Sequence, residues 1–214
     1  MLHMKTAVLW DFGGVILTSP FDAFRRYETE RGLPIDPIRN VNTTHPHSNA
    51  WALLERNEIT PEQFDGLFAS ESQALGHRVA GSDVLALLAG DVRPEMVEML
   101  DRVKTAGYRT ACLTNNVIGG DGRDLTSDGR ALQIAAILDR FDVIVESSKV
   151  GVRKPEPRFY EIACELLGVQ PEECVFLDDL GINLKPAAAM GMTTIKVTST
   201  VQAITDLTAA LGFS

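Results

Sequence analysis

A chain of 214 residues, 45% of them hydrophobic, is long enough for one domain of ordinary size or for one domain that carries a smaller inserted one. Its net charge of −9 argues against nucleic acid and anionic membranes as partners, and an anionic substrate would need local positive charge or a metal ion. There is no signal-peptide pattern and no apolar stretch long enough to span a bilayer, and the three cysteines lack metal-ligand spacing. These features predict a cytoplasmic protein whose cysteines are small buried residues.

The first half of the chain contains one predicted strand followed by a segment of different character. The strand covers residues 6–10 and ends at an Asp-Phe-Gly-Gly turn that begins with Asp11. Residues 18–91 then combine helical patterns, scattered aromatic residues and polar loops, which indicates a helical insertion. A regular pattern starts at Pro94, which suits the first position of a helix, and helical spacing continues to Gly107.

The second half alternates short apolar strands with amphipathic helices. Strands are predicted at 109–113, 142–146, 174–178 and 193–197. Helices are predicted near 130–139, after a Gly- and Asp-rich loop at 119–129, and then at 159–168, near 184–190 and at 201–211. The alternation predicts an α/β fold: a three-layer Rossmann-like core with a parallel sheet, formed by residues 1–17 and 92–214, and a helical cap inserted at 18–91.

Polar residues follow several predicted strands. They are Asp11, Thr114 with Asn115, Lys154 in a Lys-Pro-Glu-Pro turn, and the pair Asp178 and Asp179. Because ligands of parallel α/β sheets bind at the carboxyl ends of the strands, we expect these side chains to meet there. Clustered carboxylates raise one another's pKa, and a hard cation with oxygen ligands, Mg²⁺ by preference, would relieve their repulsion.

Each of these residues also has an ordinary structural explanation. Asp11 could cap a helix, Asp178 and Asp179 could form an N-cap pair, and Thr and Asn are common where a strand enters a loop. Lys154 could be an exposed lysine, with Arg153 as the competing cation, although the turn at Pro155 favours Lys154 as the fixed one. Their occurrence as an ordered set favours a functional site.

Several motifs extend this set. They are Leu113-Thr114-Asn115-Asn116, Glu146-Ser147, Lys154-Pro155-Glu156-Pro157, Phe176-Leu177-Asp178-Asp179, Leu184-Lys185-Pro186-Ala187 and Glu55-Arg56-Asn57-Glu58-Ile59-Thr60. In this order the chain resembles the haloacid dehalogenase superfamily over nearly its whole length. More closely, it resembles the phosphatase-like N-terminal domain of soluble epoxide hydrolases and its free-standing bacterial relatives.

The resemblance implies a Mg²⁺-dependent phosphatase with Asp11 as nucleophile. Asp11, the Gly13 carbonyl and Asp179 would hold the metal, supported by Asp178 and Asn183. The residues expected to bind the phosphoryl group are Lys154, which would also act with Asp11, and Thr114, Asn115 and Asn116.

One position departs from the family's pattern. Phosphatases of the superfamily usually carry a second Asp, a general acid/base, two residues after the nucleophile, and this chain has Gly13 there. His45, His47 and Glu55, all in the cap, could replace that acid, although each is more simply explained as a surface residue or a satisfied polar residue.

The sequence therefore predicts a phosphatase that hydrolyses a small phosphate monoester through an aspartyl-phosphate. Without an acid at position 13, an alcohol that leaves easily, as in a sugar 1-phosphate or an acyl phosphate, fits best. The alternatives are a 2-haloacid dehalogenase, which attacks carbon and needs no metal, and a non-catalytic phosphate-binding scaffold. The cap contains no pattern that identifies the substrate, and nothing in the sequence indicates the oligomeric state.

Overall fold

The computed structural model describes residues 4–116 and 128–213. Most of the Gly- and Asp-rich loop predicted at 119–129 therefore lies outside the described residues. The helix predicted to follow it is present as α7 (Asp128–Leu138).

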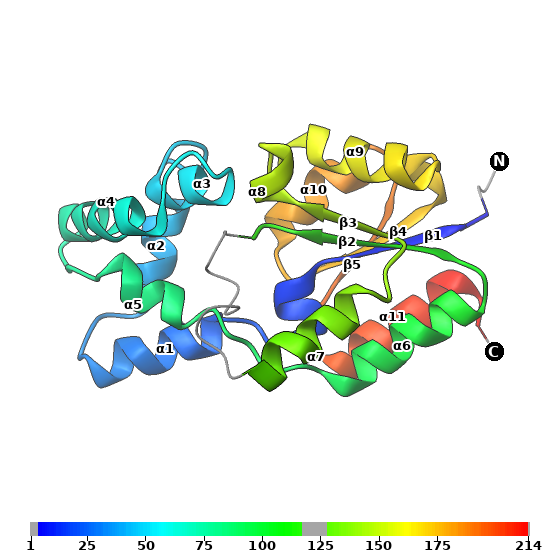
Figure 1. Ribbon diagram of the computed structural model, residues 1–214, viewed down its shortest axis with the longest axis horizontal. Helices are drawn as coiled ribbons and strands as arrows, with labels where there is room; N and C mark the ends of the chain where they lie inside the picture. The colour runs from blue at the N-terminus through cyan, green and yellow to red at the C-terminus, as the bar shows by residue number, and fades with distance from the viewer. Residues whose placement is uncertain (1–3, 117–127, 214) are drawn as a thin grey trace.

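Five parallel strands form the central sheet (Figure 1). They are β1 (Ala7–Trp10), β2 (Arg109–Thr114), β3 (Val143–Glu146), β4 (Cys174–Asp178) and β5 (Thr193–Lys196), in the spatial order β3-β2-β1-β4-β5. Trp10, the last residue of β1, lies opposite Cys112 on one side and Leu177 on the other, and β2 and β4 continue beyond these partners to Thr114 and Asp178. The predicted α/β core with a parallel sheet is confirmed.

Helices cover both faces of the sheet, which explains why its strands are almost continuously apolar. Val8 and Trp10 of β1 pack against α6 (Pro94–Thr105) and α11 (Thr200–Leu211). Ala7 and Leu9 face the opposite side, against α9 (Pro157–Leu167) and α10 (Gly181–Ala189). The short elements η1 (Phe12–Ile16), α8 (Ser147–Val150) and η2 (Pro171–Glu173) complete the core.

Helix α10 begins three residues before the start predicted near residue 184. The Asp178 carboxylate accepts a hydrogen bond from the Leu180 N–H at 2.8 Å, so the chain enters the helix almost directly from β4. Pro186 consequently lies inside α10, where it can donate no backbone hydrogen bond.

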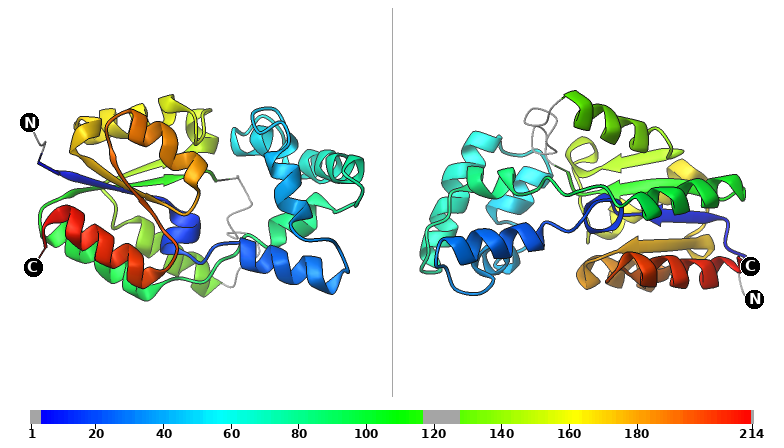
Figure 2. Two further views of the ribbon diagram at one scale, coloured as in Figure 1. Left: turned by 180° about the vertical axis from the view of Figure 1, so that it is seen from behind. Right: turned by 90° about the horizontal axis from the view of Figure 1, so that it is seen from below.

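Residues 18–91, all of them described, form five helices and add no strand to the sheet. The helices are α1 (Phe21–Glu30), α2 (Pro37–Thr43), α3 (Ala50–Glu55), α4 (Pro61–Ala74) and α5 (Gly81–Ala86). They share an apolar cluster that includes Phe24, Ile38, Leu54, Phe64 and Phe68. Figures 1 and 2 show them as a body beside the carboxyl ends of the strands. The boundaries of this cap as a domain stay a prediction.

Two adjacent chain segments join the cap to the core. Leu17 and Val92 lie opposite each other as an antiparallel pair. The Thr18 N–H donates to the Asp91 carbonyl at 2.8 Å, and the Arg93 N–H donates to the Ile16 carbonyl at 2.9 Å. The cap therefore leaves and re-enters the core at one place. Among the described residues, no helix is both long enough and apolar enough to cross a membrane.

Candidate active site

The polar residues predicted to follow strands meet at one edge of the sheet. Asp11 follows β1, Thr114 is the last residue of β2, and Asp178 is the last residue of β4. Lys154 reaches the same place from the loop between α8 and α9. The edge is the carboxyl end of the parallel strands, where the sequence predicted a site.

Lys154 connects two of the carboxylates. Its Nζ lies 2.8 Å from Asp11 Oδ1 and 2.8 Å from Asp178 Oδ2. The lysine side chain is only 1% exposed. Burial lowers the pKa of Lys154, but the two carboxylates outweigh burial, so its pKa is raised and the ammonium stays charged. Of the two cations considered from the sequence, Lys154 is the one that contacts Asp11.

Asp178 is fixed by contacts on its inner side. It is fully buried, and Asn183 Nδ2 lies 3.1 Å and 3.0 Å from its two oxygens. The Asn183 carbonyl in turn accepts a hydrogen bond from the Tyr160 hydroxyl at 2.6 Å. These contacts are compatible with the supporting role predicted for Asp178 and Asn183.

Asp179 approaches the backbone of the turn after β1. Gly14 has φ of +83°, and a Cβ added there would lie 2.3 Å from the Asp179 carboxylate. Only a glycine leaves room for this approach. The Ser19 hydroxyl, at the start of the cap, donates to Asp179 Oδ2 at 3.0 Å.

Asp11, Asp178 and Asp179 form an acidic group around Lys154. Each has a carboxylate oxygen, and these oxygens lie within 4.8 Å of one another. Burial raises the pKa of Asp11 well above its usual range against the opposing effect of Lys154, and Asp178 and Asp179 raise it further. Burial and Asp178 also raise the pKa of Asp179. The group thus holds more negative charge than the one contacting ammonium balances.

The residues predicted to bind a phosphoryl group lie at this edge but differ in their contacts. The Asn115 carboxamide clamps the backbone of Lys154: its Oδ1 accepts from the Lys154 N–H at 2.8 Å, and its Nδ2 donates to the Lys154 carbonyl at 3.0 Å. Asn116 Nδ2 donates to Glu146 Oε1 at 2.8 Å, and its Oδ1 accepts from the Ser148 hydroxyl at 2.8 Å. The carboxamides of both asparagines therefore have structural partners, although both residues line the cavity described next, as Thr114 does.

A cavity of about 490 Å³ lies between the cap and the carboxyl edge of the sheet. Asp11, Gly13, Thr114, Lys154 and Asp179 line its core side. Many of its other walls are apolar; they include Phe12, Leu17, Phe21, Phe24, Trp51, Leu88, Ile134, Leu138 and Ile182. The acidic group and Lys154 thus face a largely apolar cavity.

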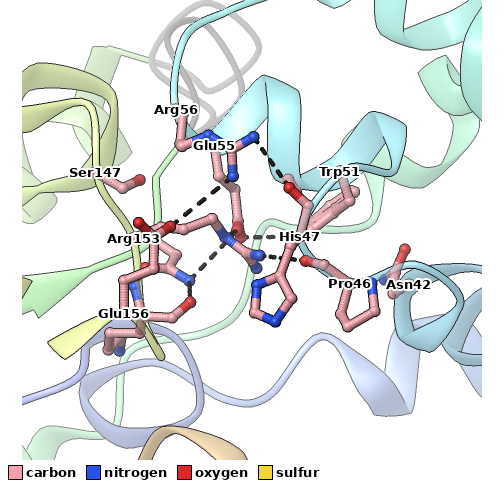
Figure 3. A network of polar contacts seen from close by, with 12 residues as sticks. Asn42, Pro46, His47, Trp51, Glu55, Arg56, Ser147, Arg153 and Glu156 are labelled. Carbon is pink, nitrogen blue, oxygen red and sulfur yellow. Dashed lines mark hydrogen bonds and ion pairs between the residues drawn. The ribbon is translucent and has the colours of Figure 1, made fainter.

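The candidates for a replacement acid have different environments. His45 and His47 are exposed, and His47 lines the cavity. Glu55 is buried and forms an ion pair with Arg153 (Figure 3). Burial raises the pKa of Glu55, against the opposing effect of Arg153. Glu55 is therefore a satisfied polar residue that joins cap and core.

The Glu55–Arg153 contact and the Ser19–Asp179 hydrogen bond were not predicted from the sequence. The partners are separated by 98 residues in the first case and 160 in the second. The motif around Glu55 contributed to the resemblance, but no local pattern indicates which core residue a cap glutamate contacts.

A model of the haloacid dehalogenase-like hydrolases matches residues 5–191 of the chain. The chain belongs to this family of hydrolases. The family resemblance seen in the sequence motifs is thereby confirmed.

Relatives of this hydrolase include segments of larger proteins. It is 35% identical to acyl-CoA dehydrogenase family member 10 of Mus musculus, over 97% of this chain and 19% of that protein. It is 33% identical to bifunctional epoxide hydrolase 2 of Mus musculus, over 95% of this chain and 38% of that protein. The chain thus spans less than half the length of either relative.

Phosphatases and dehalogenases both occur among the relatives. The hydrolase is 32% identical to phosphatase MT3486 of Mycobacterium tuberculosis, over 87% of this chain and 84% of that protein. It is 31% identical to (S)-2-haloacid dehalogenase 4A of Burkholderia cepacia, over 49% of this chain and 42% of that protein. The fold is similar to that of HAD family enzyme bt-2542 from Bacteroides thetaiotaomicron, solved in complex with magnesium and inorganic phosphate. The TM-score is 0.57 at 20% identity, and the match covers 90% of this chain and 93% of that one.

Proposed function

We propose that this hydrolase is a Mg²⁺-dependent phosphatase that hydrolyses a small phosphate monoester through an aspartyl-phosphate on Asp11. The observation that carries the proposal is the acidic group itself. Asp11 and Asp178 share one buried ammonium, and Asp179 lies within ligand reach of both. Three carboxylates around one lysine are costly to bury unless a further cation joins them.

The donor set fits a hard divalent cation. The three carboxylates offer oxygen ligands, which Mg²⁺ prefers, and Gly14 leaves the space that lets Asp179 close on the turn after β1. Asp11, Asp179 and the Gly13 carbonyl would hold the ion, because Asp178 is already engaged by Lys154, Asn183 and the Leu180 N–H. When bound, Mg²⁺ would neutralise negative charge on the phosphoryl group and on the carboxylates.

The chain's own residues account for the displacement at phosphorus. The Asp11 carboxylate attacks phosphorus and the ester oxygen leaves, which gives the aspartyl-phosphate; water then attacks phosphorus and releases inorganic phosphate. Lys154 holds Asp11 in a fixed orientation and places a positive charge beside the phosphoryl oxygens. Thr114 offers a hydroxyl from the end of β2.

Gly13 and the walls of the cavity favour one class of phosphate monoester as the substrate. Gly13 supplies no acid to protonate the departing oxygen, so a leaving group of low pKa is favoured. The apolar walls favour an alcohol or acid portion that is itself apolar. An acyl or aryl phosphate meets both conditions, whereas a sugar 1-phosphate meets only the first.

Two alternative functions, a 2-haloacid dehalogenase and a phosphate-binding scaffold, would use some of the same residues. A 2-haloacid dehalogenase would also use Asp11 and Lys154, but the halide leaves without a metal, so Asp178 and Asp179 would then crowd the site without a role. A phosphate-binding scaffold would keep the acidic group and Lys154 without turnover.

A substrate panel tests the proposal. Phosphate release from p-nitrophenyl phosphate, acetyl phosphate and glycerol phosphate is measured in Mg²⁺ and in chelator, alongside chloride release from 2-chloropropionate. We expect Mg²⁺-dependent phosphate release, and Asp11→Asn should lower it by several orders of magnitude, because the amide is no nucleophile. Chloride release in chelator would identify a dehalogenase. Phosphate binding without any turnover would identify a scaffold.

A further inference from the structure

One carboxylate of the cap contacts two loops of the core, the loop that contains Arg153 (Figure 3) and the loop that follows β2. Glu55 is the last residue of α3 and is 5% exposed. Its Oε1 accepts a hydrogen bond from the Trp51 indole at 2.9 Å. Its Oε2 accepts from the Arg153 guanidinium and, at 3.3 Å, from Asn115 Nδ2. Glu55 thus has one partner in the cap and two in the core.

One core partner of Glu55 clamps the Lys154 backbone, and the other is its neighbour in the chain. Arg153 precedes Lys154 in the chain, and Asn115 bonds to both the N–H and the carbonyl of Lys154, at 2.8 Å and 3.0 Å. The Lys154 backbone is therefore fixed by residues that Glu55 contacts. Its ammonium, in turn, lies 2.8 Å from Asp11.

This contact lies away from the two segments that join cap and core. Helix α3 contacts α8 of the core. The linkers, which run from η1 to α1 and from α5 to α6, lie below α3 in Figure 1 and pair through Leu17 and Val92. The cavity is lined from both places, by Glu55 and Arg153 at one and by Leu17 at the other. Rotation of the cap about its linkers would therefore separate Glu55 from Arg153 and open the cavity.

Further polar contacts surround the Glu55–Arg153 pair. Arg153 Nη1 donates to the Pro46 carbonyl of the cap at 2.9 Å, and Arg56 Nη1 of the cap lies 3.9 Å from Glu156 of the core. The contacts between cap and core at this place are thus formed by charged side chains and a backbone carbonyl. Such groups regain water when they separate, so opening costs less than the rupture of an apolar interface of similar size.

We propose that Glu55 is a positioning residue that makes the Lys154 ammonium depend on cap closure. With the cap closed, the Glu55 carboxylate holds Asn115 and Arg153, and these hold the Lys154 backbone so that its ammonium stays on Asp11. With the cap open, Lys154 loses this support. The inference rests on the proposed phosphatase function and adds a cap residue to its machinery.

The kinetic test compares two glutamates of the same cap region. Glu55→Gln keeps the size of the side chain but removes the charge that faces Arg153. Glu58→Gln is the matched control, because Glu58 is exposed and pairs with Arg56 within the cap. With p-nitrophenyl phosphate and Mg²⁺, we expect Glu55→Gln to lower kcat about 100-fold with little change in KM, as misplacement of a catalytic group does. Glu58→Gln should match the wild type.

A second measurement does not depend on turnover. Trp51 contacts Glu55, and the other tryptophan, Trp10, is fully buried in β1. In a Trp10→Phe background, acrylamide quenching of fluorescence reports the accessibility of Trp51 alone. Mg²⁺ with beryllium fluoride, a mimic of the phosphoryl group, should protect Trp51 when Glu55 is present and much less in Glu55→Gln. Bound beryllium fluoride is followed separately by ¹⁹F NMR.

The outcomes are distinguishable. A fall in kcat with an unchanged melting temperature, together with the loss of Trp51 protection, supports the positioning role. Values of kcat for Glu55→Gln that equal those of Glu58→Gln overturn it and leave the phosphatase function intact. If Glu55→Gln does not fold, Glu55→Asp is used; it keeps the charge but shortens the reach, so undiminished kcat there also overturns the role. A wild type that neither turns over phosphate esters nor binds beryllium fluoride overturns both proposals.

Discussion

At the scale of single residues, Gly13 governs how a leaving group would depart in the proposed reaction. Its φ and ψ are −71° and 129°, a conformation open to any residue, and an added Cβ would meet no atom within 4 Å. The glycine is therefore not required by the backbone or by packing. It leaves the place of the family's usual acid empty, next to Asp11.

Restoring an acid at this position should change the dependence of the rate on the leaving group. In the natural protein we expect aryl and acyl phosphates to react far faster than alkyl phosphates, because an unprotonated alkoxide leaves poorly. Gly13→Asp should raise the rates of alkyl phosphates, toward the roughly 10²–10⁴-fold that general acid catalysis supplies. The measurement is the slope of log(kcat/KM) against leaving-group pKa. A flat slope in the natural protein would mean that another donor acts, and His47 would be the first residue to mutate.

The meeting of Asp11, Thr114 and Asp179 could be predicted because each lies at the end of a strand of a parallel sheet, and the edge where such strands end is fixed by topology. Lys154 joins them from the loop that follows β3 and α8. The partners of Glu55 could not be predicted, because the contact joins two bodies whose relative placement is not written in any local pattern. Asn115 was predicted to offer its backbone N–H to the phosphoryl group, and that role stays a prediction; the clamp that its carboxamide forms on Lys154 was not foreseen.

At the scale of elements, the turn η1 constrains how closely Asp179 can approach Asp11. It must leave β1 at Asp11 and admit Asp179 against Gly14, and Gly14 alone of the Gly13–Gly14 pair has positive φ. The two glycines thus have different roles that the sequence motif does not distinguish.

Substitution of each glycine by alanine should separate these roles. Gly14→Ala would force the Asp179 carboxylate away and would strain the backbone, so Mg²⁺ binding measured by calorimetry should be lost or greatly weakened. Gly13→Ala is the matched control and should bind Mg²⁺ as the wild type does. Equal Mg²⁺ affinity in the two variants would show that Asp179 does not hold the ion against this turn.

Strands were easier to predict than cap helices for a physical reason. A strand buried on both faces is a continuous apolar run, and the predicted starts and ends agree with the structure to within a residue or so. The cap helices depend on distant side chains. The start of α2, for instance, is held by Glu28, which accepts from the N–H groups of Asp36 and Ile38 at 3.3 Å each. The first and last residues of the cap helices therefore could not be predicted from local sequence patterns.

At the scale of the whole molecule, the acidic group links stability to pH and to metal. The folded-state pKa of Asp179 is raised by burial and by Asp178. A carboxyl whose pKa is raised on folding contributes stability below its unfolded pKa, about 3.9, and loses that contribution as the pH rises through the folded value. In chelator, wild type should therefore lose stability relative to Asp179→Asn as the pH rises from about 4 toward neutrality.

Melting temperatures of the two proteins at a series of pH values check this expectation. Near neutral pH, added Mg²⁺ should make the wild type melt at a higher temperature than Asp179→Asn. The ion stabilises the wild type by about 2.7 kcal/mol when its concentration is 100 times its Kd, whereas the variant lacks one of its ligands. A difference between the proteins that stays constant across the pH range, with and without Mg²⁺, would contradict the assignment of Asp179 to the ion.

The pairing of Leu17 with Val92 has a consequence for how such a protein can be altered. The sheet, its register and its carboxylates are assembled from residues on either side of a single interruption, and the ends of that interruption are neighbours. The core, which contains the candidate catalytic residues, and the cap, which lines the cavity beside them, are thus joined only through two neighbouring segments of the chain. A cap of another size or shape could be spliced between the same two residues without a change in the order of the strands, and specificity could diversify while the chemistry stayed in place.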